Sequence, residues 1–297
     1  MTTAKHYLSL VKFSHTIFAM PFAFIGFFLG IKHEQQMLQN VHSSPWYVVY
    51  WPSLAGVLVC MITARNAAMA YNRYLDRHFD ALNPRTAIRE IPQGIISPQK
   101  ALRFVIVNCL VFITATFFIN RICFYLSPVA LFVILFYSYT KRFTALCHLV
   151  LGIGLSLAPI GAFLAVTGAF HTLPILFSLS VVFWVSGFDI IFALQDVAFD
   201  TEQQLYSIPS VLGKTKGLQV SKLLHLASAA FVVAAGFLGS FHVFYWIGVS
   251  IFCGMLVYQH SIVKPTDLSR VNIAFMTANG TASVVFGIFT IADMLFQ

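Results

Sequence analysis

The first residues able to do chemistry together are Asn72, Asp76 and Asp80, which are spaced i, i+4 and i+8. On one continuous helix each would be offset from the next by only about 40°, so their oxygens would share a face. Arg65 lies seven residues before Asn72 and would fall on that face about two turns deeper. An arginine deep in an apolar helix is costly unless it pairs or faces a wet cavity. We therefore expect either a functional interior at Arg65 or an ion pair between helices.

A second acidic group follows a similar pattern. Asp189, Asp196 and Asp200 are spaced i, i+7 and i+11, which also predicts a single helical face. Carboxylate and amide oxygens suit Mg²⁺, which commonly binds through one or two carboxylates together with substrate phosphates. Two such faces predict a clamp for a metal-bound diphosphate, although acids at a helix end can also be simply solvated. The expected Mg²⁺ ligands are Asn72, Asp76, Asp80, Asp196 and Asp200.

Basic residues surround both acidic groups in the sequence. Arg and Lys side chains hold phosphate oxygens through charge-assisted hydrogen bonds. Those expected to bind a diphosphate are Arg73, Arg85, Arg89, Lys141 and Arg142. Acidic groups with a basic rim thus predict a site for an anion that is bridged by metal.

Membrane helices must position these residues. Only 9% of the 297 residues are charged and the mean hydropathy is +0.82, which excludes an ordinary water-soluble domain. Apolar runs of about 18 or more residues are long enough to cross a hydrocarbon layer as helices. The sequence therefore predicts an all-α integral membrane protein with a single polytopic domain over residues 1–297. The nine expected spans are residues 14–31, 46–72, 99–119, 122–139, 145–167, 174–195, 219–239, 243–262 and 271–296.

The basic residues give this layout an orientation, because cytoplasmic loops are enriched in Lys and Arg. With the N-terminus inside, 16 of the 18 basic residues fall at or near the inner face, and only Lys32 and Arg121 fall outside. We expect a multi-pass protein of the inner, cytoplasmic membrane, with its N-terminus and its site on the cytoplasmic side. The net charge of +8 could attract membrane lipid or an anionic substrate to that face. Nucleic acid is a poor partner, because no soluble basic domain carries the charge.

The polar stretches after the second and sixth spans resemble each other. Each contains two Asp residues four positions apart, followed by an Ile-Pro pair that begins at Ile91 in the first and at Ile208 in the second. This weak internal repeat predicts two halves that each contribute an acidic helix end to a shared site.

Three sequence runs resemble the UbiA family of intramembrane prenyltransferases. N-R-Y-L-D-R-H-F-D at residues 72–80, with R-T-A-I-R at 85–89 and I-P-Q-G at 91–94, resembles the first family signature. D-I-I-F-A-L-Q-D-V-A-F-D at residues 189–200 resembles the second, and Y-S-Y-T-K-R at 137–142 is similar to the family's Tyr and Lys-Arg element. Arg73 departs from the pattern, which often has Asp at that place. The sequence of residues 187–196 is most similar to the 4-hydroxybenzoate polyprenyltransferase branch, including its members in the futalosine route to menaquinone.

The resemblance implies a nine-helix bundle with a central cavity open to the cytoplasmic side. It implies an enzyme that transfers a polyprenyl group from polyprenyl diphosphate to an aromatic acid in ubiquinone or menaquinone biosynthesis. The implied cofactor is Mg²⁺, and the implied catalytic residues are Asp76, Asp189 and Asp196. The acceptor could be 4-hydroxybenzoate or a naphthoate. A secondary transporter of an anionic substrate is the alternative class, but it would place more charge near the bilayer middle.

The acceptor is expected to bind at Arg65, Asp189 and Tyr137. A deep guanidinium matches a planar carboxylate with two hydrogen bonds, so Arg65 is expected to hold the carboxylate of the acceptor. Asp189 could orient the acceptor, or it could instead support Lys141 and Arg142.

Overall fold

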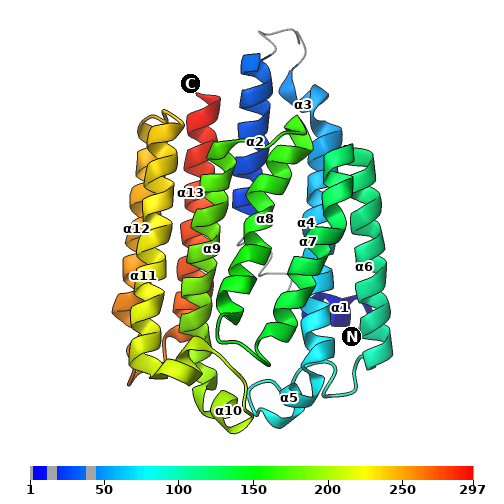
Figure 1. The fold of residues 1–297 in the computed structure, drawn as a ribbon, viewed down its shortest axis with the longest axis vertical. Coiled ribbons are helices and arrows are strands. Elements are labelled where there is room, and N and C mark those ends of the chain that lie inside the picture. Colours follow the sequence, from blue (N-terminus) through cyan, green and yellow to red (C-terminus); the bar gives the residue numbers. More distant parts are fainter. Residues whose placement is uncertain (1–2, 12–18, 38–44, 297) are drawn as a thin grey trace.

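The computed structural model describes residues 3–11, 19–37 and 45–296, and within these ranges every regular element is a helix. Figure 1 shows the long helices running alongside one another, with short helices at both ends of the bundle. The elements of the first half are α1 (Thr3–Leu10), α2 (Met20–Met37), α3 (Trp46–Val49), α4 (Trp51–Leu75), α5 (Arg77–Leu82), α6 (Pro98–Ile119) and α7 (Arg121–Thr140). Those of the second half are α8 (Cys147–Thr167), α9 (Thr172–Ala193), the 3₁₀ turn η2 (Leu194–Asp196), α10 (Val197–Glu202), α11 (Ile208–Leu238), α12 (Val243–Ile262), the π-helical turn η3 (Ile273–Ala278) and α13 (Asn279–Leu295).

Most of the long helices match the predicted spans closely, but α2 extends to Met37, beyond the predicted end at residue 31, and α11 begins earlier than predicted. Eight helical segments of the described ranges are long and apolar enough to cross a membrane, so the chain is a multi-pass membrane protein. A further long helix, α2, has 18 residues and packs along α8 and α13. The predicted first span begins in residues 14–18, which lie outside the described ranges. The predicted total of nine membrane-spanning helices therefore stays a prediction.

The helix α9 forms the centre of the bundle, between α8 and α11. The centre of its Trp184 ring lies 5.4 Å from that of Phe22 and 5.9 Å from that of Phe252, which joins α9 to α2 and α12 in one apolar core. The helices α8 and α9 approach very closely at Gly152, where a Cβ would collide with the Val182 carbonyl. This close approach brings side chains of α8 against the part of α9 that leads to the second acidic group.

Both acidic groups lie where a long helix breaks, which contradicts the prediction of two continuous helical faces. Asp76 ends α4 with φ −87° and ψ 7°, and Asp196 precedes α10 with φ −101° and ψ 2°. A ψ near zero lies outside the helical range, so the chain turns at each of these residues. In each half a six-residue helix follows and carries the second acid, Asp80 in α5 and Asp200 in α10. The shared geometry agrees with the weak repeat in the sequence.

The helix α11 begins at Ile208, eleven residues before the predicted start at residue 219. Ser207 and Ser210 form a reciprocal capping box, and Pro209 occupies the first turn. The chain then kinks at Gly213, whose φ of 83° is accessible to glycine without strain. The early start shortens the connection after α10 and holds it against the site described below.

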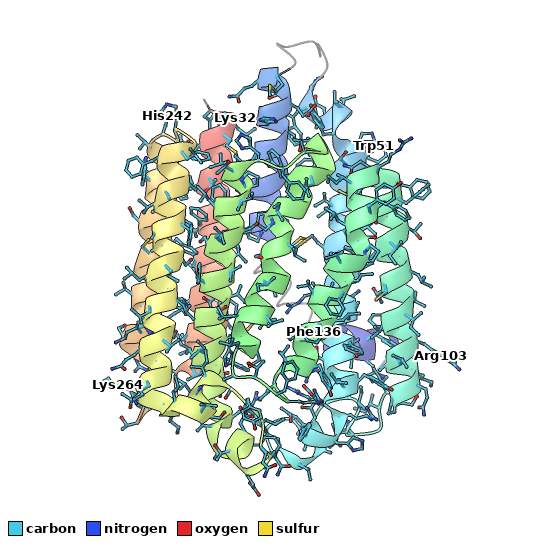
Figure 2. The ribbon with its side chains drawn as sticks, viewed as in Figure 1. Lys32, Trp51, Arg103, Phe136, His242 and Lys264 are labelled. Atoms are coloured by element: carbon cyan, nitrogen blue, oxygen red, sulfur yellow. The ribbon has the colours of Figure 1, made fainter. Side chains whose placement is uncertain are left out.

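The outer surface of the bundle is apolar between two polar ends. Large side chains such as Phe118 and Phe237 are more than 70% exposed, as expected for a surface in contact with lipid. Figure 2 places Lys264 near the end that carries α5 and α10, and Lys32 and His242 near the other end.

Candidate active site

A cavity of about 400 Å³ opens among α4, α5, α7, α8, α9 and the loops at the α5 end of the bundle. Nearly all of the predicted site residues line it. Those lining the cavity are Arg65, Asn72, Arg73, Asp76, Asp80, Arg85, Arg89, Tyr137, Lys141, Arg142, Asp189 and Asp196. The structure thus brings both sequence motifs and the Tyr and Lys-Arg element to one place.

Asp76 connects the end of α4 to the end of α7. Its Oδ1 accepts a hydrogen bond from Arg142 at 2.8 Å, and its Oδ2 accepts one from Asn72 at 3.0 Å. Arg142 also donates to the carbonyl of Leu75, an acceptor left free by the end of the helix. Burial raises the pKa of Asp76, and the Arg142 guanidinium opposes that effect. The carboxylate therefore depends on nearby positive charge to stay ionised.

Asp80 is buried more deeply on α5. Its Oδ1 pairs with Arg89 at 2.6 Å, whereas its Oδ2 is buried without a hydrogen-bond partner among the described residues. Burial raises the pKa of Asp80 to about 7, against the opposing charge of Arg73. Arg73 is 4% exposed, and its Nε and Nη1 have no hydrogen-bond partner in the described ranges. A buried carboxylate oxygen and a buried guanidinium are thus left available beside the cavity.

Asp196 is held by residues that follow the first acidic group. Arg85 donates to its two oxygens, at 3.0 Å from Nε and 2.5 Å from Nη2, and Asn83 donates to Oδ1 at 3.3 Å. The Arg85 guanidinium also lies 5.2 Å from the centre of the Phe192 ring. This bidentate pair joins the two halves of the molecule directly at the wall of the cavity.

Asp200, one of the expected Mg²⁺ ligands, does not line the cavity, because its carboxylate is buried against Lys141 instead. The residue is fully buried, its Oδ1 lies 2.6 Å from the Lys141 ammonium, and its Oδ2 accepts a hydrogen bond from Ser207 at 3.1 Å. Burial by itself would lower the pKa of Lys141, but the Asp200 carboxylate raises it. In this arrangement Asp200 fixes Lys141 at the rim.

The deeper part of the cavity combines one cation with apolar walls. Arg65 on α4 lies seven residues below Asn72, and its Nε is buried with no hydrogen-bond partner in the described part of the chain. Tyr137 of α7 lines the same region. Apolar side chains complete the walls, among them Leu151, Leu155 and Val185. An ion pair between helices, the structural alternative considered for Arg65, is absent among the described residues.

Asp189 has a partner that the sequence did not indicate. Its Oδ2 lies 2.6 Å from Nδ1 of His148, in the first turn of α8. Lys141 and Arg142 pair with Asp200 and Asp76 instead, so the alternative in which Asp189 supports them is wrong.

Three residues near the site were missed in the sequence. His148 could have been found as an ionisable side chain in an apolar span, the same argument that selected Arg65. Asn83 and Ser207 were also missed, because polar residues in loops carry little positional information.

The oxygen donors of the rim suit a hard divalent cation. Within the described residues no three His, Cys, Asp or Glu side chains converge to hold a metal alone, as expected if phosphate oxygens complete the shell. Asp76, Asp80 and Asp196 supply carboxylates, Asn72 supplies an amide, and the buried Oδ2 of Asp80 has no other partner in the described structure. The residues present therefore fit Mg²⁺ bound together with a diphosphate.

Comparisons with known proteins agree with this site. The 4-hydroxybenzoate octaprenyltransferase of Nitrosospira multiformis is 31% identical over 226 residues, covering 76% of this chain and 77% of that protein. A UbiA homologue from Aeropyrum pernix K1, solved in the apo state, has a TM-score of 0.81 at 28% identity and covers 94% of this chain and 98% of its own. A UbiA homologue from Archaeoglobus fulgidus, bound to DMAPP and Mg²⁺, shares the fold with a TM-score of 0.74 at 18% identity, over 98% and 99% of the two chains.

The family assignment follows from these matches. The model of the UbiA prenyltransferase family matches residues 37–281, which include both acidic groups and the Tyr and Lys-Arg element. The relatives are transferases, so the transporter considered from the sequence is not supported. The chain belongs to the UbiA prenyltransferase family and is a membrane-embedded prenyltransferase.

Proposed function

We propose that the enzyme transfers a polyprenyl group from a polyprenyl diphosphate to an aromatic acid of the 4-hydroxybenzoate type. The observation that carries this proposal is the division of the cavity into a charged rim and a deeper apolar region that contains Arg65. The rim suits a diphosphate, and the deeper region suits an aromatic ring that bears one carboxylate. The name of the Nitrosospira multiformis relative supports the same acceptor class.

The rim would bind the diphosphate and Mg²⁺. Asn72, Asp76, Asp80 and Asp196 would hold the ion, a role supported by the Archaeoglobus fulgidus homologue bound to DMAPP and Mg²⁺. When bound, Mg²⁺ supplies positive charge that favours departure of the diphosphate. The phosphate oxygens would be held by Arg73, Arg85, Arg89, Lys141 and Arg142. Four of these cations are paired with acids in the structure, so binding would exchange part of that pairing for phosphate contacts.

The deeper residues would act on the acceptor. Arg65 would hold its carboxylate, and Asp189 would accept a hydrogen bond from its hydroxyl, which raises the electron density of the ring carbon beside that hydroxyl. The allylic C–O bond breaks and the diphosphate leaves with the electron pair. The ring carbon forms a new C–C bond with the allylic carbon, and that ring carbon then gives its proton to the released diphosphate, which restores aromaticity. Apolar walls at Leu151, Leu155 and Val185 exclude water that would otherwise capture the allylic cation.

The proposal is tested with purified protein in lipid vesicles. Geranyl or octaprenyl diphosphate is supplied with 4-hydroxybenzoate, benzoate or 1,4-dihydroxy-2-naphthoate, with Mg²⁺ or with EDTA, and products are measured by mass spectrometry. We expect a prenylated hydroxy acid in the presence of Mg²⁺, none with EDTA, and none from benzoate. Exclusive prenylation of the naphthoate would move the assignment to that acceptor. Failure to prenylate every aromatic acid would contradict the proposal.

A further inference from the structure

A buried histidine on the wall of the cavity has no role in the proposed mechanism. His148 is 2% exposed, whereas the Asp189 side chain that it contacts is 25% exposed and lines the cavity. The contact runs from Nδ1 of His148 to Oδ2 of Asp189 at 2.6 Å. Oδ1 of Asp189 has no hydrogen-bond partner among the described residues and remains available to a ligand.

The second nitrogen of His148 determines which way this hydrogen bond runs. The backbone N–H of Ile208 points at Nε2 of His148 at 3.3 Å, so Nε2 must offer a lone pair. The proton of a neutral imidazole is then on Nδ1, which donates to Asp189. An imidazole with one nitrogen occupied by a backbone donor and the other by a carboxylate has a fixed tautomer and a fixed ring plane.

The surroundings of His148 hold it in this position. Ser186 of α9 donates to the His148 carbonyl at 3.0 Å, and the close approach of the two helices at Gly152 lies one turn away. Ile208 follows Ser207, which caps α11 and also donates to Asp200. The imidazole is therefore anchored by α8, α9 and the start of α11 together.

We propose that His148 is a positioning residue for the acceptor. Its Nδ1–H holds Oδ2 of Asp189 and thereby directs Oδ1 to the acceptor hydroxyl. This inference rests on the proposed function, because it assigns Asp189 to the hydroxyl of an aromatic acceptor. It assigns His148 no contact with the diphosphate.

Two substitutions separate the hydrogen bond from the bulk of the side chain. His148→Leu removes the donor and keeps an apolar side chain of similar size, whereas His148→Asn keeps an N–H donor close to the position of Nδ1. We expect His148→Leu to lower kcat/KM for 4-hydroxybenzoate roughly 10-fold to 100-fold, the range for one hydrogen bond to a charged group. We expect the KM for the prenyl donor to stay unchanged and His148→Asn to recover most of the loss.

A matched control and a double substitution complete the experiment. His225→Leu also removes a buried imidazole from the membrane domain, but His225 pairs with His260 and does not line the cavity. We therefore expect kcat/KM for the acceptor to stay unchanged in this variant. In an Asp189→Asn background, His148→Leu should add less than about threefold, because the two residues act as one unit.

The outcomes distinguish this inference from the proposed function. Wild-type turnover of 4-hydroxybenzoate together with full activity of His148→Leu would overturn the inference alone. The inference is also overturned if His148→Leu and His148→Asn lose activity equally and donor KM rises with them, since that pattern indicates a structural role. If the wild-type enzyme prenylates no aromatic acid, the proposed function fails and this inference fails with it.

Discussion

At the scale of single residues, four acids at or beside the rim are each paired with one cation. Arg142 pairs with Asp76, Arg89 with Asp80, Arg85 with Asp196 and Lys141 with Asp200, at 2.5 to 2.8 Å. Such pairing avoids the high cost of isolated charges in a partly buried site. Under the proposed function, a diphosphate with its Mg²⁺ would replace one partner in each pair without leaving a charge uncompensated. The pairs would then keep the rim assembled until the prenyl donor binds.

The first prediction concerns the carboxylates of the rim. Asp76→Ala or Asp196→Ala should lower turnover at least about 100-fold, because each removes a charged ligand and leaves a cation without its partner. Turnover is measured at saturating Mg²⁺, with monodispersity as the check on folding. Asp267→Ala is the matched control, because Asp267 is an exposed acid near Lys264 that contacts only its own loop. Near-normal turnover of both rim variants would remove the metal and diphosphate assignment.

The second prediction separates acceptor binding from donor binding through Arg65. Arg65→Ala should cost about 2 to 4 kcal/mol, or roughly 30-fold to 1000-fold in kcat/KM for 4-hydroxybenzoate, with little change in donor affinity. A phenolic acceptor without a carboxylate should lose far less, because it never makes the contact. Arg103→Ala is the control, an exposed arginine on α6 outside the cavity (Figure 2). If donor affinity falls and both acceptors suffer alike, Arg65 belongs to the diphosphate site.

At the scale of helices, the sequence predicted which spans carry the site but not how they end. Arg65, Asp76 and Asp196 were identifiable because ionisable groups in or beside apolar spans have few tolerable positions. The breaks at Asp76 and Asp196 were not predictable from a 3.6-residue period, because they depend on partners far along the chain such as Arg142 and Arg85. The contact between His148 and Asp189 was not predictable for the same reason, because it depends on how closely α8 approaches α9.

The third prediction tests that close approach. Gly152→Ala places a methyl group against the Val182 carbonyl and the Ser186 hydroxyl, so α8 and α9 must separate. Overpacking of this kind typically costs about 1 to 3 kcal/mol, which should lower the apparent melting temperature. We also expect kcat/KM for the acceptor to fall, because His148 and Asp189 stand on the two separated helices.

Gly161→Ala is the matched control for this prediction. It lies on the same helix, and a Cβ there meets no atom within 4 Å. The alanine should stabilise α8 or leave it unchanged, since glycine costs up to about 1 kcal/mol in a helix interior. Equal melting temperatures and equal acceptor kinetics for the two variants would show that the packing at Gly152 has no influence on the site.

At the scale of the whole molecule, the two halves meet at one end of the bundle. Figure 1 places α5 and α10 at the same end, and the Arg85–Asp196 pair connects the loops that carry them. The apolar exterior and the spans of the described helices were predictable from hydropathy alone. The relative placement of the halves was not, because it follows from long-range pairing. The side of the membrane that this end faces remains a prediction from the basic residues.

The last prediction determines that side by labelling cysteines at opposite ends of the bundle. Thr266→Cys lies beside Lys264 at the α10 end, and Ser240→Cys lies beside His242 at the other end; both positions are exposed (Figure 2). After replacement of the five native cysteines, a membrane-impermeant thiol reagent is applied to intact cells and to inverted vesicles. With 16 of the 18 basic residues assigned to the inner face, the positive-inside rule predicts that Thr266→Cys reacts only in inverted vesicles and Ser240→Cys only in intact cells. Retained prenyltransferase activity of both variants shows that labelling reports the functional fold. The reverse pattern would place the site on the outer face and would overturn the predicted orientation.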